Sequence, residues 1–122
     1  MAYRTMPELH VAETIMRYRY RWRTEDDLQA AIFETLAASG FEPRREVRLS
    51  ERDRIDLMVG RVGVEIKVAG EPPAVLRQLG RYAESDDVDA LVLVTARARH
   101  IQLPADVLGK PLVIRTLGSQ GL

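Results

Sequence analysis

Apolar positions recur along the chain with two different spacings, which together predict a mixture of helices and strands. Spacings of three and four residues predict helices at 7–16, 24–39 and 73–83. Polar and apolar residues alternate at 54–59 and 62–68, and strands are predicted there and at 46–49 and 112–115. The unbroken apolar run at 90–95 is typical of a strand buried on both faces. This order predicts an α/β fold with a mixed central β-sheet flanked by α-helices.

The two alternating segments are separated by a Gly-Arg pair at 60–61 that suits a type II′ turn, so we expect a hairpin. A two-residue loop puts Asp56 directly opposite Glu65, with Cβ atoms roughly 5 Å apart. A longer loop closing on Gly63 would place Asp56 opposite Lys67 instead. In either register Asp56, Glu65 and Lys67 share one face. The apolar face, expected to belong to the core, contains Ile55, Leu57, Val59, Val62, Val64, Ile66 and Val68.

Asp56 and Glu65 would be two like charges facing each other, which destabilises a sheet unless a cation lies between them or one carboxylate is protonated. A divalent-ion site is the simplest explanation, and oxygen ligands favour Mg²⁺ or Mn²⁺. The chain has no cysteine and two histidines, which argues against zinc; His100 is expected to be a loop or phosphate contact. Lys67 would stabilise negative charge beside the ion. A surface cluster of salt bridges is the alternative interpretation.

The helix predicted at 24–39 supplies a third carboxylate. Thr24 is a suitable N-cap for this helix. A helical wheel places Glu25 within the inward-facing apolar stripe, whereas Asp26, Asp27 and Glu34 lie outside it. Two roles remain open for Glu25: a group that binds the metal or orients water, or a first-turn partner of the helix dipole.

Aromatic and basic residues alternate from Tyr18 to Arg23. In an extended segment the aromatic side chains would lie on one face and Arg19, Arg21 and Arg23 on the other. The arginines would then contact phosphates while the aromatics stack on bases; alternatively, the aromatics seal the core or a dimer contact. Arg54 belongs to a second basic stretch that acidic neighbours dilute. The formal net charge is zero, so any attraction to nucleic acid must be local.

Between residues 24 and 95 the chain has a helix bearing Glu25, a strand, Arg54-Ile-Asp56 and Glu65-Ile-Lys67 on a hairpin, then a helix and a buried strand. This order resembles the PD-(D/E)xK nuclease superfamily. Gln78-Leu-Gly-Arg-Tyr82 is similar to the Q-x-x-x-Y element of its RecB-like branch. Gly40-Phe41 and the compact size resemble archaeal-type Holliday-junction resolvases. The chain departs from the superfamily pattern at Ile55, where proline is usual.

The resemblance implies a restriction-endonuclease-like core and a magnesium-dependent deoxyribonuclease. Asp56 and Glu65 would bind Mg²⁺ with help from the Ile66 backbone carbonyl, and Mn²⁺ would substitute. Lys67 would position water or neutralise charge. Gln78 and Tyr82 would orient Lys67 or touch substrate, with ordinary helix packing as the alternative for Tyr82. The implied function is a homodimeric Holliday-junction resolvase in DNA recombination; the alternatives are a RecB-like end-processing exonuclease and a non-catalytic nucleic-acid-binding module.

The length of 122 residues suits one compact domain. Within it, residues 1–23 are expected to form an N-terminal helix and a basic, aromatic arm, and residues 24–122 a nuclease-like domain. No apolar run approaches the roughly 20 residues of a membrane span, and the N-terminus lacks the hydrophobic stretch of a signal peptide. We therefore expect a soluble, cytoplasmic protein without a membrane partner.

Overall fold

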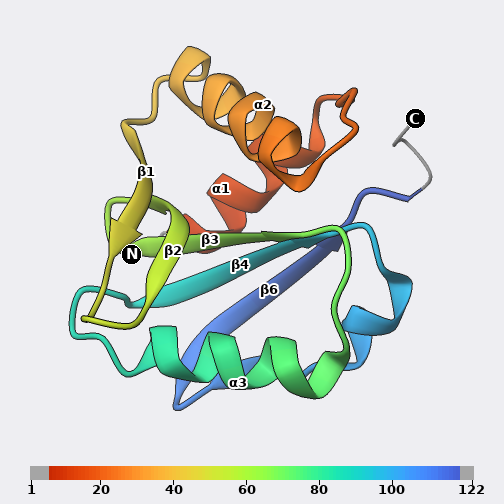
Figure 1. Ribbon diagram of the computed structural model, residues 1–122. Helices are drawn as coiled ribbons and strands as arrows, with labels where there is room; N and C mark the ends of the chain where they lie inside the picture. Colours follow the sequence, from red (N-terminus) through yellow and green to blue (C-terminus); the bar gives the residue numbers. More distant parts are fainter. Residues whose placement is uncertain (1–5, 119–122) are drawn as a thin grey trace, which may run out of the picture.

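The computed structural model describes residues 6–118, which form one mixed sheet with helices on both faces (Figure 1). The helices are α1 (Pro7–Met16), α2 (Glu25–Ala38), α3 (Pro72–Ala83) and the 3₁₀ turn η1 (Ala98–Gln102). The strands are β1 (Pro43–Arg48), β2 (Arg54–Val59), β3 (Val62–Lys67), β4 (Ala90–Thr95), β5 (Asp106–Val107) and β6 (Lys110–Thr116). The predicted α/β fold with a mixed sheet is confirmed, and the prediction missed η1 and β5.

The sheet has the order β1-β2-β3-β4-β6-β5, and its two central strands are buried on both faces. β2 runs antiparallel to β1 and to β3, whereas β3, β4 and β6 run parallel to one another, and β5 runs antiparallel to β6. α1 and α2 cover one face and α3 covers the other (Figure 1). Each face has its own apolar cluster, so β3 and β4 contribute side chains to two cores. The carboxyl ends of the parallel strands therefore meet at one end of the sheet.

The predicted start of α2 is confirmed in detail. The Thr24 hydroxyl accepts the Asp27 N–H at 3.0 Å, while the Asp27 carboxylate accepts the Thr24 N–H at 3.2 Å. This reciprocal capping box satisfies two N–H groups that the helix itself cannot pair. After the helix, Gly40 takes a left-handed φ of 95°, which is typical of a helix C-terminus. The cap fixes the position of the first turn of α2, and therefore the position of Glu25, the first residue of this helix.

The N-terminal helix α1 packs into the apolar cluster on the α2 face of the sheet. Val11, Ala12 and Ile15 are buried in the cluster that α2 shares. None of the helices within residues 6–118 combines the length and the apolar character needed to cross a membrane.

The hairpin closes with the predicted two-residue loop. Leu57 pairs with Val64 and Val59 with Val62, which excludes the longer loop. Gly60 has a φ of 58° and Arg61 has no positive φ, as a type II′ turn requires. The register places Asp56 and Glu65 just beyond Leu57 and Val64, the last backbone pair between β2 and β3.

The prediction that Ile55 shares an apolar face with Leu57 and Val59 is wrong. Ile55 packs in the cluster beneath α3, whereas Leu57 and Val59 pack beneath α1 and α2. The alternation of side chains along β2 breaks between them, at Asp56. Asp56 lies opposite Glu46 of β1, which has a φ of 52° and is not paired with it, although the positions on both sides are paired.

Glycine substitutions test how tightly the hairpin packs on the α3 face. A Cβ at Gly63 would lie 2.5 Å from Ile55 Cδ1 and 3.0 Å from Leu91 Cδ2. Both side chains are fully buried, so we expect Gly63→Ala to destabilise the fold by about 1–3 kcal/mol in urea unfolding. Gly80→Ala is the matched control: nothing lies within 4 Å of the added Cβ, and a gain of about 0.5–1 kcal/mol is expected inside α3. Equal effects of the two changes would contradict this packing.

Candidate active site

The candidate site lies where β2 leaves β3. The last backbone pair between these strands is Leu57 with Val64. Farther along β3, the Ile66 N–H donates to Asp56 Oδ2 at 2.8 Å and the Val68 N–H donates to Glu25 Oε1 at 3.0 Å. Two carboxylates from β2 and α2 thus accept the hydrogen bonds that a neighbouring strand would otherwise accept. This arrangement holds Asp56 and Glu25 beside the same edge.

Glu65 lies next to this edge and is buried, with 3% of its surface exposed. Its Oε1 accepts the Asp56 N–H at 3.3 Å, and its Oε2 lies 3.4 Å from Lys67 Nζ. The Tyr82 hydroxyl is 3.3 Å from the same Oε2 and 3.2 Å from the Arg54 carbonyl. Glu65 is therefore held from three directions, and the predicted grouping of Asp56, Glu65 and Lys67 is present with Glu25 beside it.

Burial and like charge make this site unusual for carboxylates. Burial raises the pKa of Glu65 to about 8, with the negative charge of Asp56 adding to the effect and Lys67 opposing it. Burial also raises the pKa of Asp56, while the hydrogen bond from Ile66 N–H counteracts the shift. Near neutral pH the pair therefore holds a proton that a bound cation would displace.

The oxygen atoms present suit a magnesium ion. Within residues 6–118, no group of three or more Asp, Glu, His or Cys side chains is arranged to hold a metal unaided. Mg²⁺ does not require such a group, because it binds through one or two carboxylates and keeps several waters. Asp56 and Glu65 supply two carboxylates. The Ile66 carbonyl points to the same side of β3 as the Ile66 N–H, toward Asp56, so it can supply a further oxygen.

Gln78 and Tyr82 form a hydrogen-bonded pair on α3. Gln78 Nε2 donates to the Tyr82 hydroxyl at 2.8 Å. Tyr82 is 1% exposed, so its hydroxyl reaches Glu65 and not the surface. Burial, followed by the charge of Glu65, raises the pKa of Tyr82, which keeps the hydroxyl protonated and able to donate. The pair is placed to orient Glu65.

The arm before α2 divides its side chains between the core and solvent. Tyr20 is 5% exposed and its hydroxyl donates to the Ile15 carbonyl at 2.7 Å, and Trp22 packs against the core beneath α1 and α2. Tyr18 is half-exposed. Three arginines of the arm and one on β2 are exposed: Arg19, Arg21, Arg23 and Arg54. The core-sealing alternative is therefore correct for Tyr20 and Trp22.

Arg97 is a basic residue near the site that sequence reasoning missed. Its Nε donates to the Val68 carbonyl at 3.0 Å, and the Val68 N–H is bound to Glu25. Because Lys67 pairs with Thr95 in parallel strands, a residue just after Thr95 must lie near the end of β3. The parallel pairing of β3 with β4 is therefore the feature that indicates a place for Arg97 near the site.

His100 anchors the segment that follows. It is fully buried, with Nδ1 2.6 Å from Thr95 Oγ1 and Nε2 2.8 Å from the Gly70 carbonyl. A carbonyl can only accept, so Nε2 carries a hydrogen and donates it to the Gly70 carbonyl. Of the two alternatives predicted for His100, the structure shows the loop contact and not the phosphate contact, because the buried ring ties η1 to the loop after β3.

The buried carboxyl predicts a specific pH dependence of stability. The pKa of Glu65 rises from 4.5 to about 8 on folding, so the native state binds more protons between these values. Its stabilising contribution is complete below pH 4.5 and is lost as the pH rises through about 8. One group changes stability by at most about 1.4 kcal/mol per pH unit. Urea unfolding across this range should show a falling free energy that Glu65→Gln flattens and the exposed control Glu34→Gln retains; an unchanged slope in Glu65→Gln would contradict the assignment.

Comparisons with known proteins do not identify a family. No family model, no curated protein and no solved structure matches the chain. The resemblance to PD-(D/E)xK nucleases therefore rests on the residues of this chain and on the arrangement of its site.

Proposed function

We propose that this protein is a metal-dependent nuclease that hydrolyses phosphodiester bonds in DNA, built on a restriction-endonuclease-like core. The observation that carries the proposal is the convergence of Asp56, Glu65, Lys67 and Glu25 at the open edge of β3. These residues come from three different elements, and apolar packing alone does not require their charges there. A buried like-charged pair with an adjacent lysine is suited to a cation and a phosphate.

Each residue has a role that follows from its contacts. Asp56 and Glu65 would hold Mg²⁺ or Mn²⁺, which when bound would neutralise charge on the phosphate and lower the pKa of a bound water. Lys67 Nζ, 3.4 Å from Glu65, would stabilise negative charge developing on the phosphate oxygens. Glu25, fixed through Val68, would orient the attacking water. Tyr82 is a positioning residue, since it reaches Glu65 and not the surface.

Basic side chains around the site would bind the DNA backbone. Arg23 precedes Glu25 by two residues, Arg97 is bound to the Val68 carbonyl, and Arg54 is exposed two residues before Asp56. With Tyr20 buried and Trp22 packed against the core, the exposed arginines of the arm outnumber its one exposed aromatic side chain, Tyr18. This balance favours paired DNA over extended single strands.

Within this class we propose a structure-selective endonuclease of the Holliday-junction resolvase type, acting as a homodimer so that two sites face paired strands. A RecB-like end-processing exonuclease is the second candidate, favoured by the hydrogen bond from Gln78 to Tyr82, whose hydroxyl contacts Glu65. A non-catalytic nucleic-acid-binding module is the remaining alternative.

Cleavage assays on a labelled four-way junction, a linear duplex, a covalently closed circle and duplex RNA distinguish these candidates. We expect junction cleavage that needs Mg²⁺ or Mn²⁺ and is abolished by chelator. Asp56→Asn and Lys67→Ala should each lower the rate by about 100-fold or more, while Glu34→Gln, an exposed carboxylate on the same helix as Glu25, should leave it unchanged. Attack only from free ends would support the exonuclease. Binding without metal-dependent cleavage of any substrate would refute the enzyme.

Arg97 should contribute to substrate affinity more than to chemistry. We expect Arg97→Ala to raise KM several-fold with little change in kcat, and to reduce the slope of log affinity against log salt by about 1, because one phosphate contact is lost. Arg44→Ala is the matched control: Arg44 pairs with Met58, which pairs with Gly63, so it lies toward the other end of β3. A comparable effect of Arg44→Ala would indicate nonspecific charge and not a contact near the site.

A further inference from the structure

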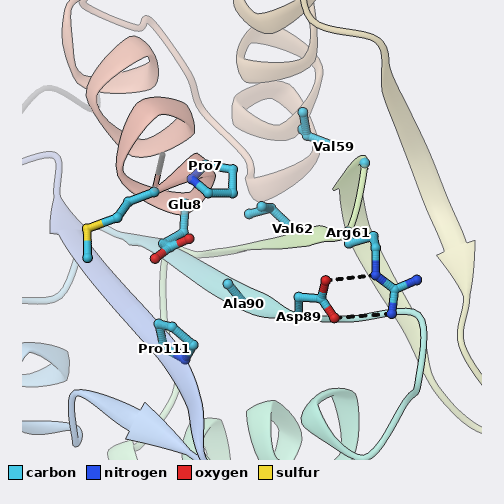
Figure 2. A pocket seen from close by; sticks show the side chains of 10 residues that line it. Pro7, Glu8, Val59, Arg61, Val62, Asp89, Ala90 and Pro111 are labelled. Carbon is cyan, nitrogen blue, oxygen red and sulfur yellow. Dashed lines mark hydrogen bonds and ion pairs between the residues drawn. The ribbon is translucent and has the colours of Figure 1, made fainter. Parts of the chain in front are cut away.

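A separate pocket lies at the opposite end of the sheet from the candidate active site. It has a volume of about 530 Å³ and lies between α1, the β2–β3 turn and the starts of β4 and β6 (Figure 2). Val62 and Ala90, the paired first residues of β3 and β4, form part of its floor, whereas Lys67 and Thr95 are paired at the other end. Five residues of strand separate the two places, or roughly 16 Å. The pocket is thus independent of the proposed nuclease site.

The walls of the pocket are mainly apolar, but one carboxylate lies inside. Pro7, Val59, Val62 and Pro111 are among its apolar lining. Glu8, in the first turn of α1, is 8% exposed, and its carboxylate points into the space above Ala90 (Figure 2). Among residues 6–118 no hydrogen bond or ion pair reaches this carboxylate. In the described part of the chain, the pocket therefore combines apolar walls with a carboxylate that has no hydrogen-bond partner.

The other charges of the pocket are already matched. Arg61 donates to both carboxylate oxygens of Asp89, at 2.8 and 3.1 Å, and also to the Asp86 carbonyl (Figure 2). Asp86 and Asp87 lie on the same loop and are exposed. Counting only residues 6–118, and with Lys110 bound to the Ser85 carbonyl of the same loop, the charge left unbalanced in and beside the pocket is negative.

The helix dipole explains part of the placement of Glu8. A carboxylate in the first turn is favourable next to the positive end of α1, typically by about 0.3–1 kcal/mol at an exposed position. Within residues 6–118, Trp22 Nε1 is the one buried side-chain nitrogen or oxygen without a partner, so the oxygens of Glu8 keep contact with solvent inside the pocket. The carboxylate is therefore open to a cationic group that enters the pocket.

We propose that this pocket binds a small ligand carrying an ammonium or guanidinium group on a short alkyl stem. Glu8 binds the cationic group, and the stem packs against Val59, Val62 and Pro111. The volume lies in the range of small-molecule sites. An anionic ligand is disfavoured, because it would meet the Glu8 carboxylate, and Arg61, the one cationic side chain among the described lining residues, is already paired with Asp89.

Titration with agmatine, followed by ¹H–¹⁵N spectra, tests the proposal on the full chain. We expect saturable shifts at the amides of Glu8, Val62 and Ala90 with a dissociation constant of about 1 mM or below, and none with n-pentanol, an uncharged control. Glu8→Gln should weaken binding at least tenfold, and Glu8→Asp, which keeps the charge on a shorter side chain, should weaken it less. Glu13→Gln, an exposed change on the same helix, should bind as the wild type does.

Three results would overturn the site. These are no saturable shift with agmatine, shifts that occur elsewhere on the protein, or equal binding by the wild type and a folded Glu8→Gln variant. Because DNA cleavage is assayed separately, failure of the pocket leaves the proposed nuclease untouched, and failure of the nuclease leaves the pocket untouched.

Discussion

Beyond the Leu57–Val64 pair, β3 loses its strand neighbour on one side, and the candidate site depends on how the exposed backbone is satisfied. Buried N–H groups are almost always paired in native proteins. Asp56 accepts the one from Ile66, and Glu25 accepts the one from Val68. Each carboxylate is thereby fixed through one of its two oxygens, and within residues 6–118 the second oxygen accepts no backbone hydrogen bond. The parting of β2 from β3 thus positions two acidic side chains, and no separate loop is needed to hold them.

The same arrangement also carries an electrostatic cost, because the charged forms of Asp56 and Glu65 are disfavoured there. Glu65 is buried beside Asp56, and the fold offsets their repulsion with Lys67, the Tyr82 hydroxyl and a retained proton. An apolar pair at these positions would need none of these contacts, and buried ionic groups are often less stabilising than well-packed apolar ones. Local departures from the rules of stable folding are expected to concentrate at functional sites. This cost is therefore an argument for function that does not depend on family resemblance.

The sequence carried enough information to predict the hairpin, the capped start of α2 and the grouping of Asp56, Glu65 and Lys67, because each depends on local alternation or turn chemistry. It did not reveal the break in alternation at Asp56, which lies opposite a left-handed residue on the neighbouring strand, Glu46. Nor did it reveal the burial of His100, whose ring binds residues from two other segments. Contacts between segments far apart in the chain have no local signature, so periodicity could not find them.

The two proposed sites lie at opposite ends of β3. The start of α2 and the arm before it lie at the carboxyl end of β3, as the Glu25–Val68 hydrogen bond requires, and this end also carries Arg97 (Figure 1). The opposite end carries Glu8 and the acidic loop from Asp86 to Asp89, where Arg61 pairs with Asp89. Five residue steps of β3 separate the two places, or roughly 16 Å. A DNA backbone bound at the open edge of β3, as proposed, would not have to enter the pocket, so both proposed sites could be occupied at once.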